Sequence, residues 1–230
     1  MTGRLLAQGA QGDWDWNFAL EILPLLLQGL VVTVQATIMG ILVAMTLGLV
    51  LALARRSRRK LISWPVGGFV EAVRSTPLLA QLFFLYFVLP EFGIVLSPLL
   101  IGVLGLGLHY ACYTSESYRA GIESVPRGQW EAAVALNMSQ ATRWRRVVLP
   151  QAIPTVIPAL GNYLVAMFKD APLLSTVTVL ELLAVARSIQ GATFRGLEAF
   201  TLAGVLFLAV SIPASVLVRY LERRYQYARA

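Results

Sequence analysis

Residues 128–150 read GQWEAAVALNMSQATRWRRVVLP and include most of the one long hydrophilic stretch between apolar runs, residues 118–146. Good helix formers occupy residues 129–136. Asn137 follows them, and asparagine is one of the few non-glycine residues that tolerate a left-handed turn. A basic segment then leads to Pro150, which can begin a helix because a first-turn proline loses no helical hydrogen bond. The stretch therefore predicts a helix, a turn and a second helix.

Two placements of the first short helix agree with this pattern. The helix can project into a groove of a partner protein, where the Glu131 carboxylate would pair with a partner arginine. It can equally rest on lipid headgroups as an amphipathic helix. The residues alone leave both placements open.

The rest of the chain has the composition of a membrane protein. Of its 230 residues, 57% are hydrophobic and 13% are charged, whereas an average soluble domain has about 25% charged residues. A membrane-spanning helix needs about 20 mostly apolar residues. We therefore expect one all-α transmembrane domain over residues 1–230, with an interfacial segment at 23–30 and then five spans. The expected spans cover about residues 30–54, 66–89, 98–117, 150–176 and 200–220.

Positive charge marks one side of the membrane. Most of the 19 Lys and Arg residues fall in three clusters, whereas the opposite side keeps only Arg4, Arg187 and Arg195. Because short loops rich in Lys and Arg stay in the cytoplasm, the clusters orient a multi-pass membrane protein. Its N-terminus would lie outside, and its C-terminus and loop 118–146 would lie in the cytoplasm. The clusters are Arg55, Arg56, Arg58, Arg59 and Lys60; Arg127, Arg143, Arg145 and Arg146; and Arg219, Arg223, Arg224 and Arg229.

Several classes of function are excluded. A net charge of +7 could suit a nucleic-acid binder, but the charges sit at the ends of apolar runs, so we expect no nucleic-acid partner. The single cysteine, Cys112, excludes an internal disulfide and a multi-cysteine metal site. The one histidine and the lack of paired aspartates in the spans argue against an intramembrane enzyme. Residues 1–12 lack the layout of a cleavable signal peptide.

Charged residues inside the expected spans are candidates for a solute path, because charges are costly there. Three groups stand out: Glu71 with Arg74, Glu116 with Arg119, and Lys169 beside Asp170. The first two pairs are spaced i, i+3 and can neutralise each other on one helix face. Adjacent residues point apart on a helix, so Lys169 and Asp170 are candidates to bind the two charges of a zwitterionic solute.

Backbone signals add to the interpretation of two spans. Ala171 precedes Pro172, and a pre-proline residue is pushed out of the helical region, so the fourth span should break beside Lys169 and Asp170. Broken helices at membrane depth are tolerated where they line a cavity. In the first span a stripe of small residues predicts close helix packing, within the subunit or with a partner. The stripe is Ala36, Gly40, Ala44, Gly48 and Ala52.

The loop resembles the Glu-Ala-Ala (EAA) motif of ABC importer permeases: Glu-Ala-Ala, three residues, Gly, nine residues, Ile, one residue, Leu-Pro. Here the motif positions are Glu131-Ala132-Ala133, Asn137 for the glycine, Val147 for the isoleucine, and Leu149-Pro150, with Gly128-Gln129-Trp130 directly before them. Further segments are similar to the polar amino acid uptake group, the histidine and glutamate permease type. These are Arg74-Ser75-Thr76-Pro77-Leu78-Leu79, Tyr118-Arg119-Ala120-Gly121-Ile122 and Lys169-Asp170.

Within that group, residues 168–174 (FKDAPLL) and 108–110 (LHY) look most like ectoine and hydroxyectoine permeases. The broader group more often has Thr-Ser where Ala171-Pro172 stand here.

The resemblance implies a type I ABC importer permease of the bacterial inner membrane, with a cytoplasmic coupling helix around Glu131. Such a permease pairs with a second permease subunit, identical or related, and works in the bilayer with two ATP-binding subunits and an external solute-binding protein. The chain has no Gly-x-x-x-x-Gly-Lys-Ser/Thr phosphate loop. We therefore expect a permease that is not itself an enzyme and needs no cofactor, since ATP would bind to the partner subunit.

The predicted function is ATP-driven import of a small zwitterionic solute, either ectoine or hydroxyectoine or a polar amino acid. An ion-coupled secondary transporter of amino acids that uses Lys169 and Asp170 is the alternative. It would leave the EAA-spaced loop without an explanation, and the chain shows no internal repeat of the kind common in such transporters.

Overall fold

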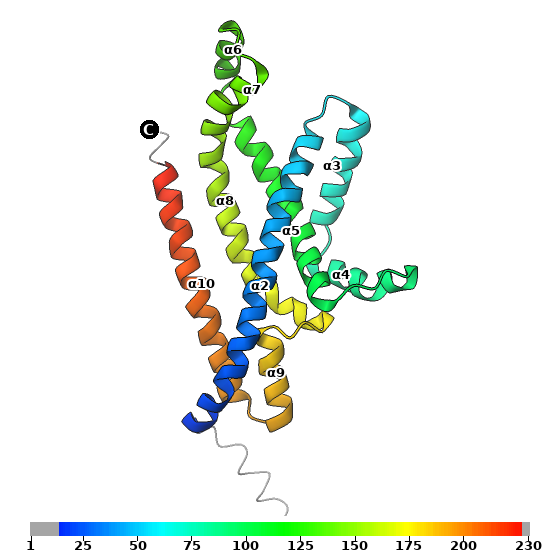
Figure 1. Ribbon diagram of the computed structural model, residues 1–230, viewed down its shortest axis with the longest axis vertical. Helices are drawn as coiled ribbons and strands as arrows, with labels where there is room; N and C mark the ends of the chain where they lie inside the picture. The colour runs from blue at the N-terminus through cyan, green and yellow to red at the C-terminus, as the bar shows by residue number, and fades with distance from the viewer. Residues whose placement is uncertain (1–13, 227–230) are drawn as a thin grey trace, which may run out of the picture.

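The computed structural model describes residues 14–226, and this part of the chain is helical throughout apart from short connections (Figure 1). Residues 1–12, Arg4 and Arg229, which entered the analysis of topology, lie outside the described residues. The α-helices are α2 (Trp16–Arg55), α3 (Lys60–Arg74), α4 (Leu78–Phe83), α5 (Pro98–Glu123), α6 (Arg127–Ala135), α7 (Gln140–Arg143), α8 (Leu149–Asp170), α9 (Leu182–Thr193) and α10 (Gly196–Gln226). Short π-helices cover Phe84–Val88 (η1) and Trp144–Val148 (η3), and 3-10 helices cover Leu89–Phe92 (η2) and Ala171–Val177 (η4).

Four helical stretches among the described residues are long and apolar enough to cross a membrane: Trp16–Arg55, Pro98–Glu123, Gln140–Val177 and Gly196–Arg224. The bent pair Lys60–Arg74 and Leu78–Phe92 makes a fifth if it is taken as one span. The prediction of an all-α protein with about five spans is thereby confirmed. The end of α2, the α6–α7 region and the end of α10 all lie at one end of the molecule, and α9 lies at the other (Figure 1).

The second span, expected over residues 66–89, is bent. The chain turns by 105° between α3 and the α4–η2 stretch. Thr76 precedes Pro77, and the helical conformation is disfavoured before a proline. The Gln81 side chain then satisfies carbonyls freed at the end of α3, because its Nε2 donates to the oxygens of Val73 at 2.8 Å and Thr76 at 3.2 Å. The span expected over residues 66–89 is therefore made of two helical pieces that meet at Pro77.

Three other elements bear on the predictions. The segment expected at the interface, 23–30, is continuous with α2, which begins at Trp16 where Asp15 accepts from the Asn17 and Phe18 amides. The break predicted beside Asp170 takes a milder form: α8 ends at Asp170, but Ala171 keeps a helical conformation (φ −54°, ψ −31°) and the chain continues as the 3-10 helix η4. The expectation that Ala171 would leave the helical region was wrong. Helix α9 was not expected.

The small-residue stripe of α2 packs within the subunit, and its partner is α5. Ala36, Ala44 and Ala52 are buried, and the Thr114 hydroxyl of α5 donates to the Ala44 carbonyl at 2.8 Å. A Cβ on Gly48 would overlap the Thr114 hydroxyl and lie 2.8 Å from the Ala111 carbonyl oxygen. Apolar burial gives little drive for helix association in lipid, where small residues instead let helices pack closely and hydrogen-bond to each other, as these two helices do. We call this contact the α2–α5 seam.

The opposite end of the bundle is held by polar contacts among α2, α9 and α10. The buried Glu181 side chain caps α9 by accepting from the Leu183 and Ala184 amides at 2.9 and 2.6 Å. Burial raises the pKa of Glu181 to about 7, against these hydrogen bonds, which act to lower it. Arg195 joins the starts of α2 and α10, because its guanidinium lies 3.1 Å from Asp15 and 2.8 Å from Glu198.

Exchanging Gly48 for alanine tests the seam. Because the added Cβ meets backbone and the Thr114 hydroxyl, Gly48→Ala should lower the Tm of the purified protein in detergent by several degrees. Gly204→Ala on α10 is the matched control, since a Cβ there meets nothing within 4 Å, and it should leave the Tm unchanged or slightly higher. Equal Tm values for the two variants would contradict the proposed importance of the seam.

Candidate functional site

Helix α6 projects at the end of the molecule that carries the end of α2 (Figure 1). Its inner side is formed by Ala133, which is buried, and Trp130, which packs on a cluster of buried apolar residues. The left-handed turn predicted at Asn137 is present, with φ 52°. The buried cluster beneath the helix comprises Ile122, Val125, Val148 and Ala152. Anchored below and turning sharply after its last residues, α6 is a short helix with one side left free.

The free side of α6 carries most of the residues expected to contact an ATPase. The exposed positions are Gly128, Gln129, Glu131 and Ala132, and the large apolar residues Val134 and Leu136 are 52% and 71% exposed. A groove in a partner protein could therefore take a carboxylate together with apolar side chains. Leu149 and Pro150 begin α8 and are also exposed.

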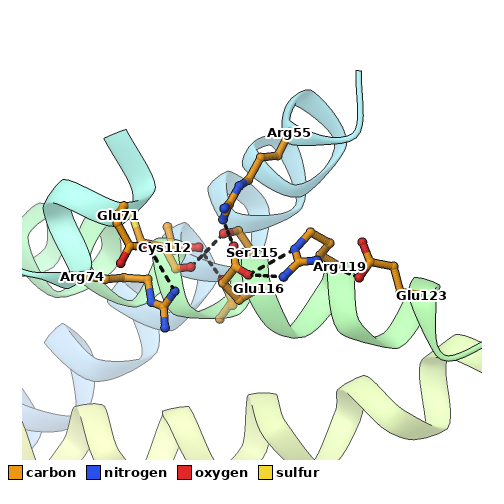
Figure 2. Close-up of polar contacts among 10 residues, drawn as sticks. Arg55, Glu71, Arg74, Cys112, Ser115, Glu116, Arg119 and Glu123 are labelled. Atoms are coloured by element: carbon orange, nitrogen blue, oxygen red, sulfur yellow. Dashed lines mark hydrogen bonds and ion pairs between the residues drawn. The ribbon is translucent and has the colours of Figure 1, made fainter. Parts of the chain in front are cut away.

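The charges expected in the third span form a network that includes α2. Glu116 accepts from Arg119, 2.8 Å away, and it also pairs with Arg55 at the end of α2. Arg119 lies 2.7 Å from Glu123 as well. Figure 2 shows Glu116 between the two arginines. This ion network (Arg55, Glu116, Arg119, Glu123) joins the end of α2 to the last turns of α5. Arg55 was missed in the sequence because its partner is 61 residues away.

Arg74 ends α3 beside this network. Its guanidinium lies over the Tyr113 ring, 5.2 Å from the centroid, and its nearest carboxylate oxygen, on Glu71, is 3.8 Å away. The Arg74 Nε is buried without a hydrogen-bond partner in the structure. Arg74 therefore keeps donor capacity for an anionic group.

Asp170 faces α5 and a group of rings. The Tyr110 hydroxyl donates to its Oδ2 at 2.7 Å. The aromatic cluster (His109, Tyr110, Tyr113 and Tyr163) has neighbouring ring centroids 5.1–6.2 Å apart. Aromatic faces attract cations, so a carboxylate beside this cluster is suited to an ammonium group.

Lys169 lies elsewhere. It is exposed and lines a cavity of about 470 Å³ with residues of α9 and α10, among them Leu183, Phe200 and Phe207. The structure therefore brings Asp170 together with Tyr110, and it does not bring Lys169 to the same surroundings. No cluster of three or more His, Cys, Asp or Glu side chains among residues 14–226 is arranged to hold a metal ion.

These features match a known family. Binding-protein-dependent transport system inner membrane components match residues 44–227. The chain belongs to this family. Members are permease subunits of ABC importers, and in general such subunits act with a partner permease, an ATPase and a binding protein.

Relatives agree over nearly the whole chain. A probable amino-acid ABC transporter permease protein, y4tG of Sinorhizobium fredii, is 48% identical over 92% of this chain and 91% of its own length. The nopaline transport system permease protein NocM of Agrobacterium fabrum is 36% identical, with 90% of each chain covered. The glutamate/aspartate import permease protein GltK of Escherichia coli is 32% identical, with 92% and 98% covered.

Solved structures agree with the fold. A chain in the crystal structure of an amino acid ABC transporter with histidines superposes with a TM-score of 0.86 at 33% identity, covering 92% of this permease and 99% of that chain. A chain of the inward-facing MetNI methionine ABC transporter, at 17% identity and a TM-score of 0.63 over 90% and 99% of the two chains, shares the type I fold. The protein is therefore an amino-acid-type ABC importer permease subunit, a multi-pass membrane protein.

The ion network gives a stability prediction. Glu116→Gln removes the charge that lies between Arg55 and Arg119, and we expect it to destabilise the protein by about 1–3 kcal/mol. Glu123→Gln is the matched control because the Glu123 side chain is 51% exposed, against 20% for Glu116, and an exposed pair contributes about 0–1 kcal/mol. Thermal unfolding in detergent measures both variants. A loss for Glu123→Gln as large as for Glu116→Gln would contradict the central place of Glu116.

Proposed function

We propose that this permease imports a small zwitterionic solute, driven by ATP that a separate subunit binds and hydrolyses. The observation that carries this proposal is α6: a short helix anchored on one side, with Glu131 and apolar residues on its free side. The chain would work as a pair of permease subunits with two ATP-binding subunits and an external solute-binding protein. Gly128, Gln129, Trp130, Glu131, Ala132, Ala133, Asn137, Leu149 and Pro150 are the EAA-like residues assigned to ATPase coupling.

The proposed orientation follows from the charges. Arg55 at the end of α2, the residues around α6 and the end of α10 share one end of the molecule, and all three regions are basic (Figure 1). With that end in the cytoplasm, the C-terminus lies inside and α9 lies outside, which agrees with the positive-inside rule. Helix α6 then faces the compartment in which ATP is available.

The solute would pass along the side of α5 that carries the aromatic cluster. Asp170 would bind the ammonium group of the solute. Arg74, whose Nε has no hydrogen-bond partner, would bind its carboxylate. Glu116 and Arg119 would line the same path nearer the cytoplasm. Polar amino acids are the first solutes to test, because the named relatives carry amino acids and their derivatives. Ectoine and hydroxyectoine belong in the same test because of the resemblance at residues 168–174.

Uptake into proteoliposomes tests the function. The permease, assembled with the ATPase and binding protein of its own system, should take up a labelled amino acid or ectoine only with ATP inside. Glu131→Lys should abolish uptake and weaken ATPase copurification, since it puts a like charge against the expected partner arginine. Glu91→Lys reverses an exposed acid far from α6 and should leave ATPase copurification unchanged. Uptake driven by an ion gradient without the ATPase would refute the proposal.

The solute path is tested by two neighbouring substitutions. Asp170→Asn keeps an acceptor for the Tyr110 hydroxyl but removes the charge, so we expect uptake at subsaturating solute to fall about tenfold or more. Lys169→Met should have little effect, because Lys169 lies against α9 and α10. Thermal unfolding checks that both variants are folded. Unchanged uptake in Asp170→Asn would overturn the assignment of Asp170 to the solute path, and a fall in Lys169→Met as large as in Asp170→Asn would show that Lys169 belongs to the path as well.

A further inference from the structure

The cytoplasmic end of α2 contacts two different parts of the protein through neighbouring arginines. Arg55 pairs with Glu116 of α5. Arg56, the next residue, places its guanidinium over the Trp144 ring, 5.8 Å from the centroid. Trp144 begins η3, which leads directly into α8. One end of α2 thus touches both the helix that enters the α6 region and the segment that leaves it.

Trp144 also connects to α6. Its ring meets the Trp130 ring edge to face, with centroids 5.6 Å apart and an interplanar angle of 85°. Both tryptophans pack on the cluster formed by Ile122, Val125, Val148 and Ala152. Contacts therefore run without interruption from α6 through Trp130 and Trp144 to Arg56.

The contacts through Trp130 and Trp144 connect α6 to α2, a helix to which α6 has no direct connection through the backbone. Helix α6 is joined covalently to α5 and, through α7 and η3, to α8, so a displacement of α6 acts on those two helices through the backbone. Helix α2 has no such connection. It is the longest helix of the described residues, and the α2–α5 seam holds it along its length. A contact at its end can therefore act on the whole helix.

We propose that Arg56 and Trp144 form a joint that transmits movement of α6 to α2. The proposal rests on the proposed function, in which α6 is displaced by the ATPase. Both residues are positioning residues: they touch neither ATP nor solute. A cation–π contact at an exposed site is weak, so the joint should bias the transport step by about two- to fivefold rather than decide assembly.

The test is the number of solute molecules transported per ATP hydrolysed, in proteoliposomes that contain the full complex with the binding protein and solute present. Arg56→Gln and Trp144→Leu should each lower this ratio by about two- to fivefold. The double variant should be no worse than either single variant, because the two residues act through one contact. Trp144→Phe keeps a ring and should restore most of the ratio.

Arg58→Gln is the control, since it removes an exposed arginine two residues further along the same turn. It should leave the ratio at the wild-type value. An unchanged ratio in Arg56→Gln and Trp144→Leu, in complexes that assemble and import, would overturn the joint and leave the function standing. An equal fall in Arg58→Gln would also overturn it, because general positive charge would then explain the effect. Absence of ATP-driven uptake in the wild type would refute the proposed function itself.

Discussion

The close approach of α2 and α5 is the constraint on which the rest of the structure depends. In lipid, helices associate through contact between their surfaces, and small residues permit the closest contact. Gly48 and Ala44 let the α5 backbone come near enough for Thr114 to donate to a carbonyl of α2. The same packing fixes how far α2 extends along α5, and it therefore sets Arg55 beside Glu116.

Along helix α5, the aromatic cluster, the ion network and the connection to α6 follow one another. Its middle holds Tyr110 and Tyr113 of the aromatic cluster, next to Asp170 and Arg74. Within the next two turns, Glu116 and Arg119 form the ion network, and a three-residue connection then joins the helix to α6. A rigid helix that touches all three regions links the expected solute path to the expected ATPase contact by a short physical route.

Local patterns in the sequence predicted the features that depend on local chemistry. The apolar runs predicted an all-α membrane fold, and Asn137 predicted a left-handed turn that is present. At the Ala171-Pro172 step the α-helix ends as expected, but Ala171 stays helical and a 3-10 helix continues the chain. The bend at Pro77 had the same kind of signal, and it follows the polar residues Arg74-Ser75-Thr76. It was overlooked because the apolar stretches on its two sides were taken together as one span. Features that depend on distant residues left no such signal. The pairing of Arg55 with Glu116, and the separation of Lys169 from Asp170, follow from how α2, α8 and α10 pack.

Glu181 makes the stability of the folded protein depend on pH. Its carboxyl has a pKa of about 7 in the folded protein and an ordinary value of 4.5, so the folded chain holds this proton more tightly than the unfolded chain does. The stability that this proton contributes is fully present below pH 4.5 and is lost as the pH rises through about 7. The end of the bundle that carries α9 is therefore held together more firmly in acidic than in alkaline surroundings.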